Sequence, residues 1–500
     1  MSDDRAPILV GAGQLTQRDV EPAQALEPVA LMAAAARIAA DAAGAGERLL
    51  RAVDRVAAVN VFCYPYGNVP RLLAERVGAH PVEELYTTIG GNTPQWLVNV
   101  MAARIAAGQA DVVLLAGAEA MRSVARARRE RVRLAWGGGD GTPMILGDAR
   151  DGVSPHEVTH GLALPTAVYP LFENAVRARR GWTLDEHRRR LGVLCSRLAA
   201  VAAANPHAWF RERRTPEEIT TVTPENRLIG FPYPKLMNAI LDVDQAAAVI
   251  MTSVGRARAL GIPPSRWVYV RGGADAHDHW LVSERVDHAS SPAIRATGRV
   301  ALAAAGVGID DVDLFDLYSC FPCAVEIACD MLGIPDGDPR PLTVTGGLPY
   351  FGGPGNDYAM HGIASMYERL RAAPGATGLV TAVGWYLTKH AVGVYGTTPP
   401  SRPYAVVDSA RLQAAIDGEP HPALVESPSG AGTIETYTVL HDRDGEPIRG
   451  IVIGRLDDGR RFLANTPADR ALLESLTRTE AIGRRGRVEP DGDTNRFTFS

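Results

Sequence analysis

Two stretches of the chain carry the same order of helices, strands and glycine pairs, and this repetition constrains the fold more than any other feature. The pairs Gly90-Gly91 and Gly346-Gly347 lie 256 residues apart, and Val61 and Leu317 are separated by the same interval. Self-similarity over such an interval indicates an internal duplication of one structural unit. A chance similarity between two alanine-rich helices is the alternative.

Each of the two stretches alternates helices with apolar strands. Apart from Asp111, the run at 110–117 is apolar, which is typical of a parallel strand buried on both faces. Alternation of this kind predicts an α/β fold. The first stretch contains predicted strands at 8–13, 56–61, 110–117 and 244–253, with helices at 28–43 and 96–107. The second contains predicted helices at 296–306 and 323–332, with strands at 312–317 and 378–384.

The segments outside the duplicated elements differ in character. An arginine-rich, irregular stretch at about 122–234 separates the two units, and most of its arginines fit a solvated helical face. After Tyr404, short strands with Asp/Gly turns predict a small β-barrel of about 95 residues. We therefore expect an N-terminal half at 1–255 that includes a loop domain at about 122–234, a C-terminal half at 256–404, and a barrel at 405–500.

Composition excludes several classes of function. The 52 basic and 57 acidic residues give a net charge of −5, which offers no general attraction to nucleic acid or to an anionic membrane. Five cysteines are too few for a disulfide framework, and no zinc-ligand spacing accompanies them, so we expect no metal. The acidic N-terminus lacks the pattern of a secretory signal, and no apolar run could span a membrane. We expect a cytoplasmic protein.

Three segments resemble the thiolase superfamily, most closely its sterol-carrier-protein-type thiolase-like branch. They are IAAGQADVVLLAGAEAM (105–121), KLMNAILDVDQAAAVI (235–250) and GIDDVDLFDLYSCF (308–321), and the resemblance covers about residues 5–400. It implies two βαβαβαββ halves stacked in five layers, with a loop domain that binds coenzyme A. It also implies a homodimer formed through the N-terminal halves, although the extra domain leaves a monomer possible.

The residues at the family's catalytic positions differ from the family pattern. Gly90 in TTIGGNTPQWL stands where thiolases have the nucleophilic cysteine, and Gly353 stands where they have the histidine of Gly-His-Pro. Ala382 replaces the second cysteine of Cys-x-Gly, and Tyr318 replaces an Asn or His of the oxyanion hole. Because removing an activated nucleophile costs on the order of 10⁶ in rate in other enzymes, standard two-step acyl transfer is not expected.

Several polar residues could still act where the loops of the two halves meet. The expected catalytic candidates are Tyr318, His361, Cys320, His390 and Tyr350. The alternative is structural: core tyrosines with satisfied hydroxyl groups, and a packing role for His361. Cys320 accompanies the reactive cysteine in related proteins, but no base paired to it is evident. The expected substrate-binding residues are Gly90, Gly91, Asn92, Gly353, Gly384 and Lys389.

The C-terminal segment resembles the OB-fold part of the DUF35 family, whose members often act beside thiolase-like partners. The zinc-ribbon portion of that family is missing, and few aromatic residues are spaced for base stacking, so nucleic-acid binding is not expected. The leading hypothesis is a protein of acetyl-CoA acetyltransferase type by fold, connected with lipid metabolism, that binds coenzyme A or an acyl-CoA without ordinary thiolase activity. The alternatives are a retro-aldolase for a β-hydroxyacyl-CoA that uses tyrosine as acid and base, and a non-catalytic scaffold.

Overall fold

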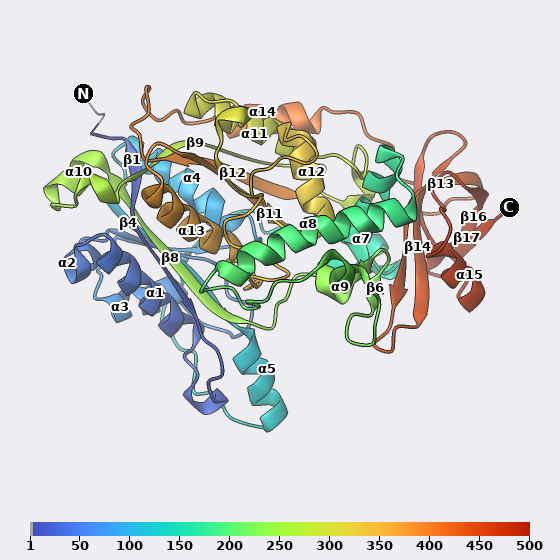
Figure 1. Cartoon of the computed structure of the whole chain (residues 1–500), viewed down its shortest axis with the longest axis horizontal. Coiled ribbons are helices and arrows are strands. Elements are labelled where there is room, and N and C mark those ends of the chain that lie inside the picture. Colours follow the sequence, from blue (N-terminus) through green and yellow to red (C-terminus); the bar gives the residue numbers. More distant parts are fainter. Residues whose placement is uncertain (1–3) are drawn as a thin grey trace.

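The computed structural model describes residues 4–500 and shows the predicted duplication as two sets of strands (Figure 1). The strands of the N-terminal half lie in the order β1-β8-β4-β2-β3-β5, and those of the C-terminal half in the order β9-β12-β11-β10. A short antiparallel pairing of β1 with β9 joins the two sets into one ten-stranded sheet within this part of the chain. The strands are β1 (Pro7–Thr16), β2 (Arg55–Ala58), β3 (Glu83–Thr87), β4 (Val112–Ala120), β5 (Met144–Leu146), β8 (Asp244–Ser253), β9 (Val268–His277), β10 (Leu314–Asp316), β11 (Thr377–Gly384) and β12 (Lys389–Gly396).

Helices cover both outer faces and fill the space between the two sets of strands. The N-terminal outer layer contains α1 (Pro28–Ala42), α2 (Gly46–Arg51) and α3 (Val69–Val77), and α11 (Pro292–Ala305) and α12 (Pro322–Leu332) form the opposite outer layer. In the middle, α4 (Thr93–Ala106) and α13 (Tyr358–Ala372) contact strands of both halves. The predicted five-layer α/β fold is therefore confirmed, and α10 (Val254–Ala259) leads from one half to the other.

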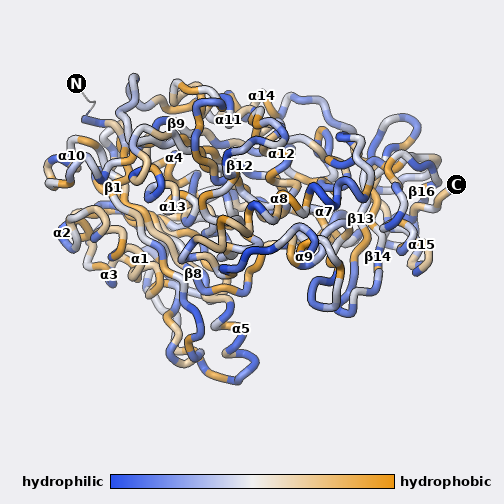
Figure 2. The backbone as a smooth tube through the Cα atoms, viewed as in Figure 1, coloured by the Kyte–Doolittle hydropathy of each residue, from blue (hydrophilic) through white to orange (hydrophobic). Residues whose placement is uncertain are grey.

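Glycine lets the outer helices lie directly on the strands, in the same way in both halves. A β-carbon at Gly13 in β1 would lie 2.2 Å from the Ala35 oxygen of α1, and one at Gly272 in β9 would lie 2.3 Å from the Ala301 oxygen of α11. Hydrophobic segments gather along β1, β8 and the neighbouring helices, whereas many exposed loops are hydrophilic (Figure 2). Close packing of small residues is thus a shared device of the duplicated unit.

The predicted strands at 56–61 and 312–317 are shorter than expected. The first ends at Ala58 because side chains then replace the strand partners: the Asn60 N–H donates to Thr87 Oγ1 at 3.0 Å, and the Val61 N–H donates to the Tyr86 hydroxyl at 2.9 Å. The second is reduced to β10, whose register with β11 covers three residues. Apolar residues therefore continue beyond the paired part of each strand.

The arginine-rich insertion folds as helices and two short strands. It contains α5 (Met121–Glu130), α6 (Pro155–Thr159), α7 (Pro165–Arg180), α8 (Leu184–Ala204), α9 (Pro216–Thr220), β6 (Leu228–Gly230) and β7 (Tyr233–Pro234). Helix α5 projects from the body of the molecule. Helices α7 and α8 lie across that body and lead toward the C-terminal barrel (Figure 1). None of the helices among residues 4–500 combines the length and apolarity needed to cross a membrane.

The predicted C-terminal barrel is confirmed and is closed by five strands. Their order is β14-β15-β17-β16-β13, and β13 pairs back with β14. A single pairing of Leu440 with Gly230 extends this sheet into the insertion. The elements are α14 (Ser409–Asp417) before the barrel, then β13 (Gly430–His441), β14 (Pro447–Leu456), β15 (Arg461–Asn465), α15 (Arg470–Leu476), β16 (Arg485–Asp491) and β17 (Thr494–Phe499).

One fully buried arginine attaches the barrel to the C-terminal half. Arg461 forms an ion pair with Glu435 of the barrel, with an N–O distance of 2.6 Å. The same guanidinium donates to the backbone oxygens of Ser283, at 3.0 Å, and Arg285. Ser283 and Arg285 lie in the C-terminal half, just before α11. The Arg461 guanidinium therefore donates both to the barrel and to the C-terminal half, and so holds the two together.

We predict that Arg461→Met lowers the free energy of unfolding by about 2–4 kcal/mol, because the buried oxygens of Ser283 and Arg285 lose their donor and Glu435 keeps only Arg455 and His288 as partners. Arg460→Met is the matched control: Arg460 pairs with Asp458 at the surface, so its loss is expected to cost about 1 kcal/mol or less. Urea denaturation followed by circular dichroism measures both variants. Equal, small losses for the two substitutions would contradict this account of the attachment.

Candidate functional site

The loop before helix α4 meets a lysine of the other half. A β-carbon at Gly90 would lie 2.4 Å from Asn92 Oδ1 and 2.9 Å from Lys389 Nζ. A β-carbon at Gly384 would lie 2.3 Å from Asn92 Oδ1 and 3.0 Å from Lys389 Cε. These separations are too short for a side chain, so glycine at both positions leaves the space that Lys389 occupies. The predicted site residues Gly90, Asn92, Gly384 and Lys389 therefore do come together.

Lys389 is a buried cation with a single hydrogen bond from its side chain. Its residue surface is 6% exposed, and Nζ donates to the Ile89 oxygen at 2.6 Å. Burial lowers the pKa of Lys389 to about 8, because the ammonium loses hydration. The Asp148 charge opposes this shift, and the Arg150 charge adds to it. A substantial fraction of free amine near neutral pH follows.

The turn between β11 and β12 places Lys389 and is held in an unfavourable backbone conformation. Trp385 and Leu387 have φ angles of 55° and 54°, in the left-handed region that residues other than glycine seldom adopt. The buried Arg285 donates to the Tyr386 oxygen at 2.9 Å and to Thr388 Oγ1 at 2.7 Å. Such strain persists only where surrounding contacts determine the conformation, and it is frequent at functional sites.

A cavity of about 780 Å³ opens beside Lys389. Two buried acceptors there, Thr88 Oγ1 and Asn92 Oδ1, have no hydrogen-bond partner among residues 4–500. An adjoining cavity of about 280 Å³ contains Trp385, whose Nε1 also lacks a partner within the described chain. Buried polar atoms without partners are costly and are commonly satisfied by a ligand or water. The larger cavity is lined by Thr88, Asn92, Thr93, Trp96, Gly147, Asp148, Ala149, Asp275, Ala276, His277, Trp280, Lys389, His390, Ser409, Ala410 and Gln413.

Tyr318 lies on the other side of the same glycine pair. A β-carbon at Gly91 would be only 2.2 Å from the Tyr318 hydroxyl, so the structure brings these two predicted site residues into contact. The Tyr318 ring packs edge-on against Tyr358 with centroids 5.5 Å apart. Burial raises the pKa of Tyr318, and the neighbouring Cys320 adds to the shift, so the hydroxyl keeps its proton at neutral pH.

The two candidate histidines are held by separate buried partners. His390 Nε2 lies 3.2 Å from Asp278 Oδ2, and it shares with Tyr318 the lining of a void of about 10 Å³. His361 Nδ1 lies 2.9 Å from Gln14 Oε1 in the middle layer. Burial lowers the pKa of His361 far below its ordinary value, and His207 lowers it further, so its ring is neutral.

The remaining candidates lie outside the Lys389 cavity. Burial raises the pKa of Cys320 to about 12, although a hydrogen bond with Tyr169 opposes the shift. Tyr350 is buried beside Cys195, and its hydroxyl has no partner among the described residues. A β-carbon at Gly353 would approach Leu348 and the Ile240 oxygen at 3.3 and 3.4 Å. None of these three residues lines the cavity.

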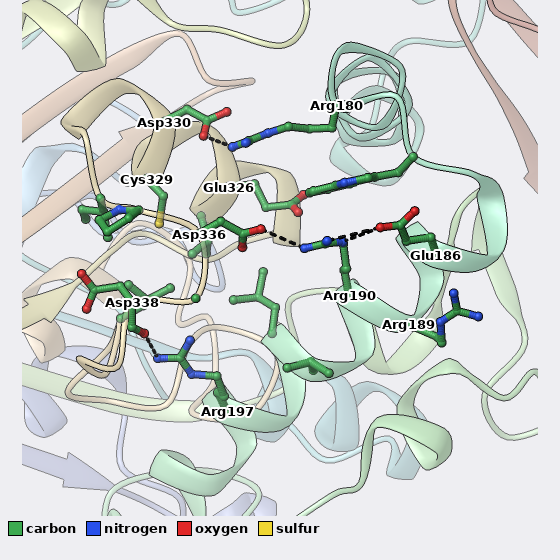
Figure 3. Close-up of a pocket in the computed structure, with 18 residues that line it drawn as sticks. Arg180, Glu186, Arg189, Arg190, Arg197, Glu326, Cys329, Asp330, Asp336 and Asp338 are labelled. Carbon is green, nitrogen blue, oxygen red and sulfur yellow. Dashed lines mark hydrogen bonds and ion pairs between the residues drawn. The ribbon is translucent and has the colours of Figure 1, made fainter.

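A second cavity, of about 570 Å³, lies between α8 of the insertion and α12 of the C-terminal half (Figure 3). Most of its arginines are already paired: Arg180 with Asp330, Arg190 with Glu186 and Asp336, and Arg197 with backbone oxygens of the loop that follows α12. Arg189 contacts none of the acidic side chains drawn in Figure 3. The expectation that most insertion arginines belong to solvated, ion-paired faces agrees with these contacts.

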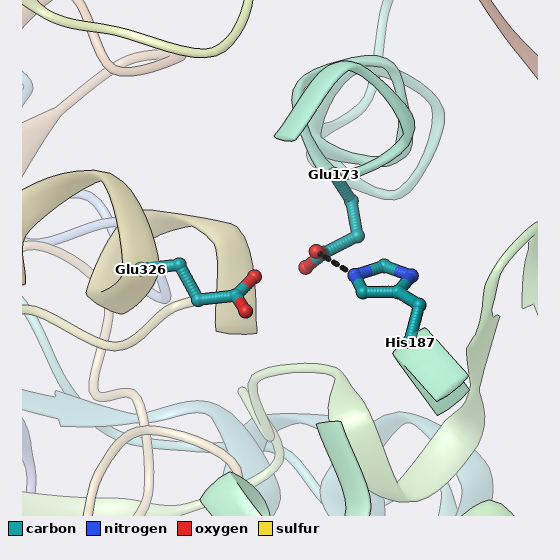
Figure 4. Close-up of side chains that lie close together, drawn as sticks. All are labelled: Glu173, His187 and Glu326. Atoms are coloured by element: carbon teal, nitrogen blue, oxygen red, sulfur yellow. Dashed lines mark hydrogen bonds and ion pairs between the residues drawn. The ribbon is translucent and has the colours of Figure 1, made fainter. Parts of the chain in front are cut away.

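Glu326, which is partly buried and lines this cavity, lies close to the buried Glu173 and His187 (Figure 4). Glu173 Oε1 lies 2.7 Å from His187 Nε2, and the Tyr233 hydroxyl donates to Glu173 Oε2 at 2.6 Å. Burial, and then the charge of Glu173, raises the pKa of Glu326, which therefore carries a proton and donates it to Glu173. The potential ligand atoms of Glu173, His187 and Glu326 lie within 4.8 Å of one another, and the shared proton accounts for their closeness.

Sequence reasoning did not find several residues of these sites. Thr88 lies in the motif TTIGGNTPQWL but is not among the expected site residues, and Asp275 and Arg285 belong to no motif that the resemblance supplied. Burial raises the pKa of Asp275 to about 6, and this carboxyl lines the Lys389 cavity. Asp275 lies in none of the predicted elements and Glu173 lies in the arginine-rich stretch, so only the folded arrangement distinguishes them from ordinary surface acids.

The two stacked halves, with the first turn of α4 between them, define a thiolase-like protein. A monomeric SCP2-thiolase-like protein type 1 from Mycobacterium smegmatis is 40% identical, with 100% of both chains covered and a TM-score of 0.87. Residues 411–493 match the family described as the thiolase-like protein type 1 additional C-terminal domain. The chain therefore belongs to the SCP2-thiolase-like protein type 1 family.

More distant relatives share parts of this similarity. The acetyl-CoA acetyltransferase of Methanothermobacter thermautotrophicus is 25% identical over 273 residues, which are 53% of this chain, and the chain spans 62% of the length of that relative. A solved structure of an Ltp2-ChsH2(DUF35) aldolase is 19% identical with a TM-score of 0.59, and covers 78% of this chain and 98% of its own. At this identity the aldolase supports the fold alone.

We predict that Glu326→Gln changes the free energy of unfolding at about pH 4 by about 1 kcal/mol or less, because Glu326 is then protonated in the folded and the unfolded chain and the glutamine amide can replace the donated proton. Glu173→Gln leaves one acceptor oxygen where the carboxylate had two, for donors from His187, Tyr233 and Glu326, and is expected to cost about 2–4 kcal/mol at pH 7. Thermal and urea denaturation of the two isosteric variants measure the difference.

The stability difference between Glu326→Gln and the wild type is expected to change with pH in one direction. A carboxyl whose pKa is raised by folding stabilises the native state below its unfolded pKa, and this contribution is lost as pH rises toward the folded pKa. Glu326→Gln is therefore expected to gain stability relative to the wild type between pH 5 and pH 8. A constant difference over this range would show that Glu326 is not protonated in the native protein.

Proposed function

We propose that the chain binds coenzyme A or an acyl-CoA and does not carry out the two-step acyl transfer of a thiolase. The absence of two-step acyl transfer is supported by the residues at the first turn of α4. There, Gly90 occupies the position at which the resemblance expects a cysteine, and Lys389 and Asn92 fill the space in front of it. Because Gly90 has no side chain and so supplies no nucleophile, no acyl-enzyme is expected from this position.

The cysteines of the chain offer no substitute nucleophile. Burial raises the pKa of all five thiols: to about 12 for Cys195, Cys320 and Cys329, and far above the ordinary value for Cys63 and Cys323. A thiolate, rather than a thiol, is the reactive species. Acetyl transfer through Cys320 is therefore not part of the proposal.

The arginine-lined cavity supports the coenzyme A part of the proposal. It lies between the insertion and the C-terminal half, and so beside the groove between the two halves and the loop domain in which the family resemblance expects the ligand. Arginine forks match the geometry of phosphate oxygens, and Arg189 does not contact the acidic side chains that engage its neighbours. The 3′-phosphate and pyrophosphate would bind there, with coenzyme A acting as a ligand rather than as a resident cofactor.

We further propose that the chain acts as a monomer in the cytoplasm. The outer edge of β3 is covered by β5 of the same chain, through parallel pairing of Leu85 with Met144 and of Thr87 with Leu146. The edge of this sheet is therefore β5, which is only three residues long, and so short an edge strand disfavours pairing between chains. The homodimer that the superfamily resemblance implies is less favoured for this reason, and the relative from Mycobacterium smegmatis is described as monomeric.

Calorimetry with coenzyme A tests the proposal. We expect modest affinity that weakens as the ionic strength rises, because phosphate and guanidinium charges are screened by salt. Arg189→Gln is expected to weaken binding several-fold, whereas Arg129→Gln on the projecting helix α5 serves as the matched control with unchanged affinity.

Three results would contradict or redirect this account. Affinity independent of salt would remove the phosphates from the arginine cavity, and no binding at millimolar coenzyme A would favour the scaffold hypothesis. A stoichiometric acetyl adduct after incubation with acetyl-CoA, lost in Cys320→Ser, would restore acyl transfer. Mass spectrometry of the intact chain and its peptides detects such an adduct.

A second candidate function is cleavage of a β-hydroxyacyl-CoA by a retro-aldol reaction. The observation that favours it is the contact between the Tyr318 hydroxyl and Gly91, at the point where the two halves meet. A protonated tyrosine there can donate to an oxygen and exchange its proton with a substrate. Fusion to an OB-like barrel would also fit an aldolase that elsewhere works with a DUF35 partner.

Tyr318→Phe is expected to lower aldol cleavage by about 10² or more with little change in coenzyme A affinity, because the ring packing is retained and only the hydroxyl is lost. A structural tyrosine would instead cost about 1 kcal/mol of stability and leave turnover almost unchanged. Turnover of a β-hydroxyacyl-CoA panel is compared at matched thermal stability. Tyr350→Phe, away from the Gly91 contact, is the control substitution.

A further inference from the structure

Lysine is almost absent from this chain. Of the 52 basic residues, 50 are arginine, and the two lysines are Lys235 and Lys389. Lys235 is exposed, whereas Lys389 is buried beside the cavity of about 780 Å³. Arginine cannot lose its proton at any ordinary pH, and lysine can. The buried lysine therefore supplies a group that no arginine of this chain could supply.

The surroundings of Lys389 make room for its amine rather than neutralise its charge. Both Gly90 and Gly384 lack the β-carbon that would collide with the lysine side chain. Among residues 4–500, no carboxylate lies within ion-pair distance of Nζ, whose one hydrogen bond is to the Ile89 oxygen. The strained turn at Trp385 and Leu387 comes directly before the lysine and determines where β12 begins. A buried amine of this kind is available as a nucleophile.

Asp275 lies on the same face of the sheet as Lys389. In the antiparallel register of β9 and β12, Lys389 is opposite His277 and Ala391 is opposite Asp275. Residues two apart on a strand share a face, so the lysine and this aspartate are diagonal neighbours. Both residues line the cavity, and burial raises the pKa of Asp275 to about 6. An acid of this strength can transfer protons near neutral pH.

We propose that Lys389 is a nucleophilic amine that captures the carbonyl carbon of a small aldehyde or ketone in this cavity as a Schiff base, with Asp275 transferring the protons. The free amine forms a nitrogen–carbon bond while the carbonyl oxygen takes a proton. The carbon–oxygen bond of the resulting carbinolamine then breaks, and the oxygen leaves as water after protonation by Asp275. The nitrogen lone pair completes the C=N bond, and the Asp275 carboxylate takes the two protons that nitrogen loses, one from the carbinolamine and one from the iminium, so that the acid is regenerated and one water is released.

The orphaned acceptors give the cavity a means of orienting such a ligand. Thr88 Oγ1 and Asn92 Oδ1 can bond to hydroxyl groups carried by the ligand beside its carbonyl. This inference does not rest on coenzyme A binding, because the reacting group is a carbonyl carbon and the arginine cavity takes no part. The experiment below therefore fails or succeeds independently of the calorimetry.

The test is reductive trapping on the full-length protein. The protein is incubated with acetaldehyde and sodium cyanoborohydride near pH 7.5, and peptide mass spectrometry follows ethylation at Lys389, at Lys235 and at the N-terminal amine separately. Lys235 is the built-in control, because it is an exposed amine in the same molecule. We expect Lys389 to be labelled at least about tenfold faster than Lys235, since a lowered pKa exposes more free amine at this pH.

Two variants test whether the labelling of Lys389 depends on the residues around its amine. Asp275→Asn is expected to slow labelling of Lys389 by about tenfold or more while leaving Lys235 unchanged. Gly90→Ala places a β-carbon against Nζ and is expected to reduce labelling of Lys389, with circular dichroism used to confirm folding. Labelling of Lys235 without labelling of Lys389 in the wild type would overturn the proposal, as would equal labelling of Lys389 in the wild type and Asp275→Asn.

Discussion

The position of one buried ammonium group determines how the centre of this molecule is arranged. Lys389 begins β12 and reaches across to the loop before α4, where it hydrogen-bonds to Ile89. Its side chain can lie there only because Gly90 and Gly384 have no side chains. Arg285 holds the preceding turn, and its backbone oxygen accepts from the buried Arg461 of the barrel. The barrel, the C-terminal half and the lysine are thus connected by consecutive contacts.

Much of the fold could be predicted from the sequence because the same order of helices, strands and glycine pairs occurs in both halves of the duplicated unit. The strand at 244–253 and the helix at 28–43 agree with β8 and α1 to within one residue, since long apolar or alanine-rich runs give a strong periodic signal. The strand at 56–61 was overextended, because its last residues remain apolar while side chains of Thr87 and Tyr86 replace the strand partners. Such replacements depend on residues distant in the sequence.

The site was predictable only in part. The resemblance pointed to Gly90, Gly91, Gly384 and Tyr318, and the structure brings these together around the first turn of α4. It could not show that a lysine fills the space before Gly90, because Lys389 and Gly90 are separated by almost 300 residues. Asp275 and Arg285 were missed for the same reason: their role depends on the pairing of β9 with β12 and on the turn that follows β11.

The central claim is that the first turn of α4, between Lys389 and Tyr318, is the ligand site of this thiolase-like chain. A crystal structure of the protein soaked with coenzyme A tests it most directly. The account predicts that the phosphates lie against the insertion and that the thiol end of the pantetheine arm reaches the Gly90-Gly91 loop. An ordered coenzyme A whose thiol end lies away from both Lys389 and Tyr318 would contradict it.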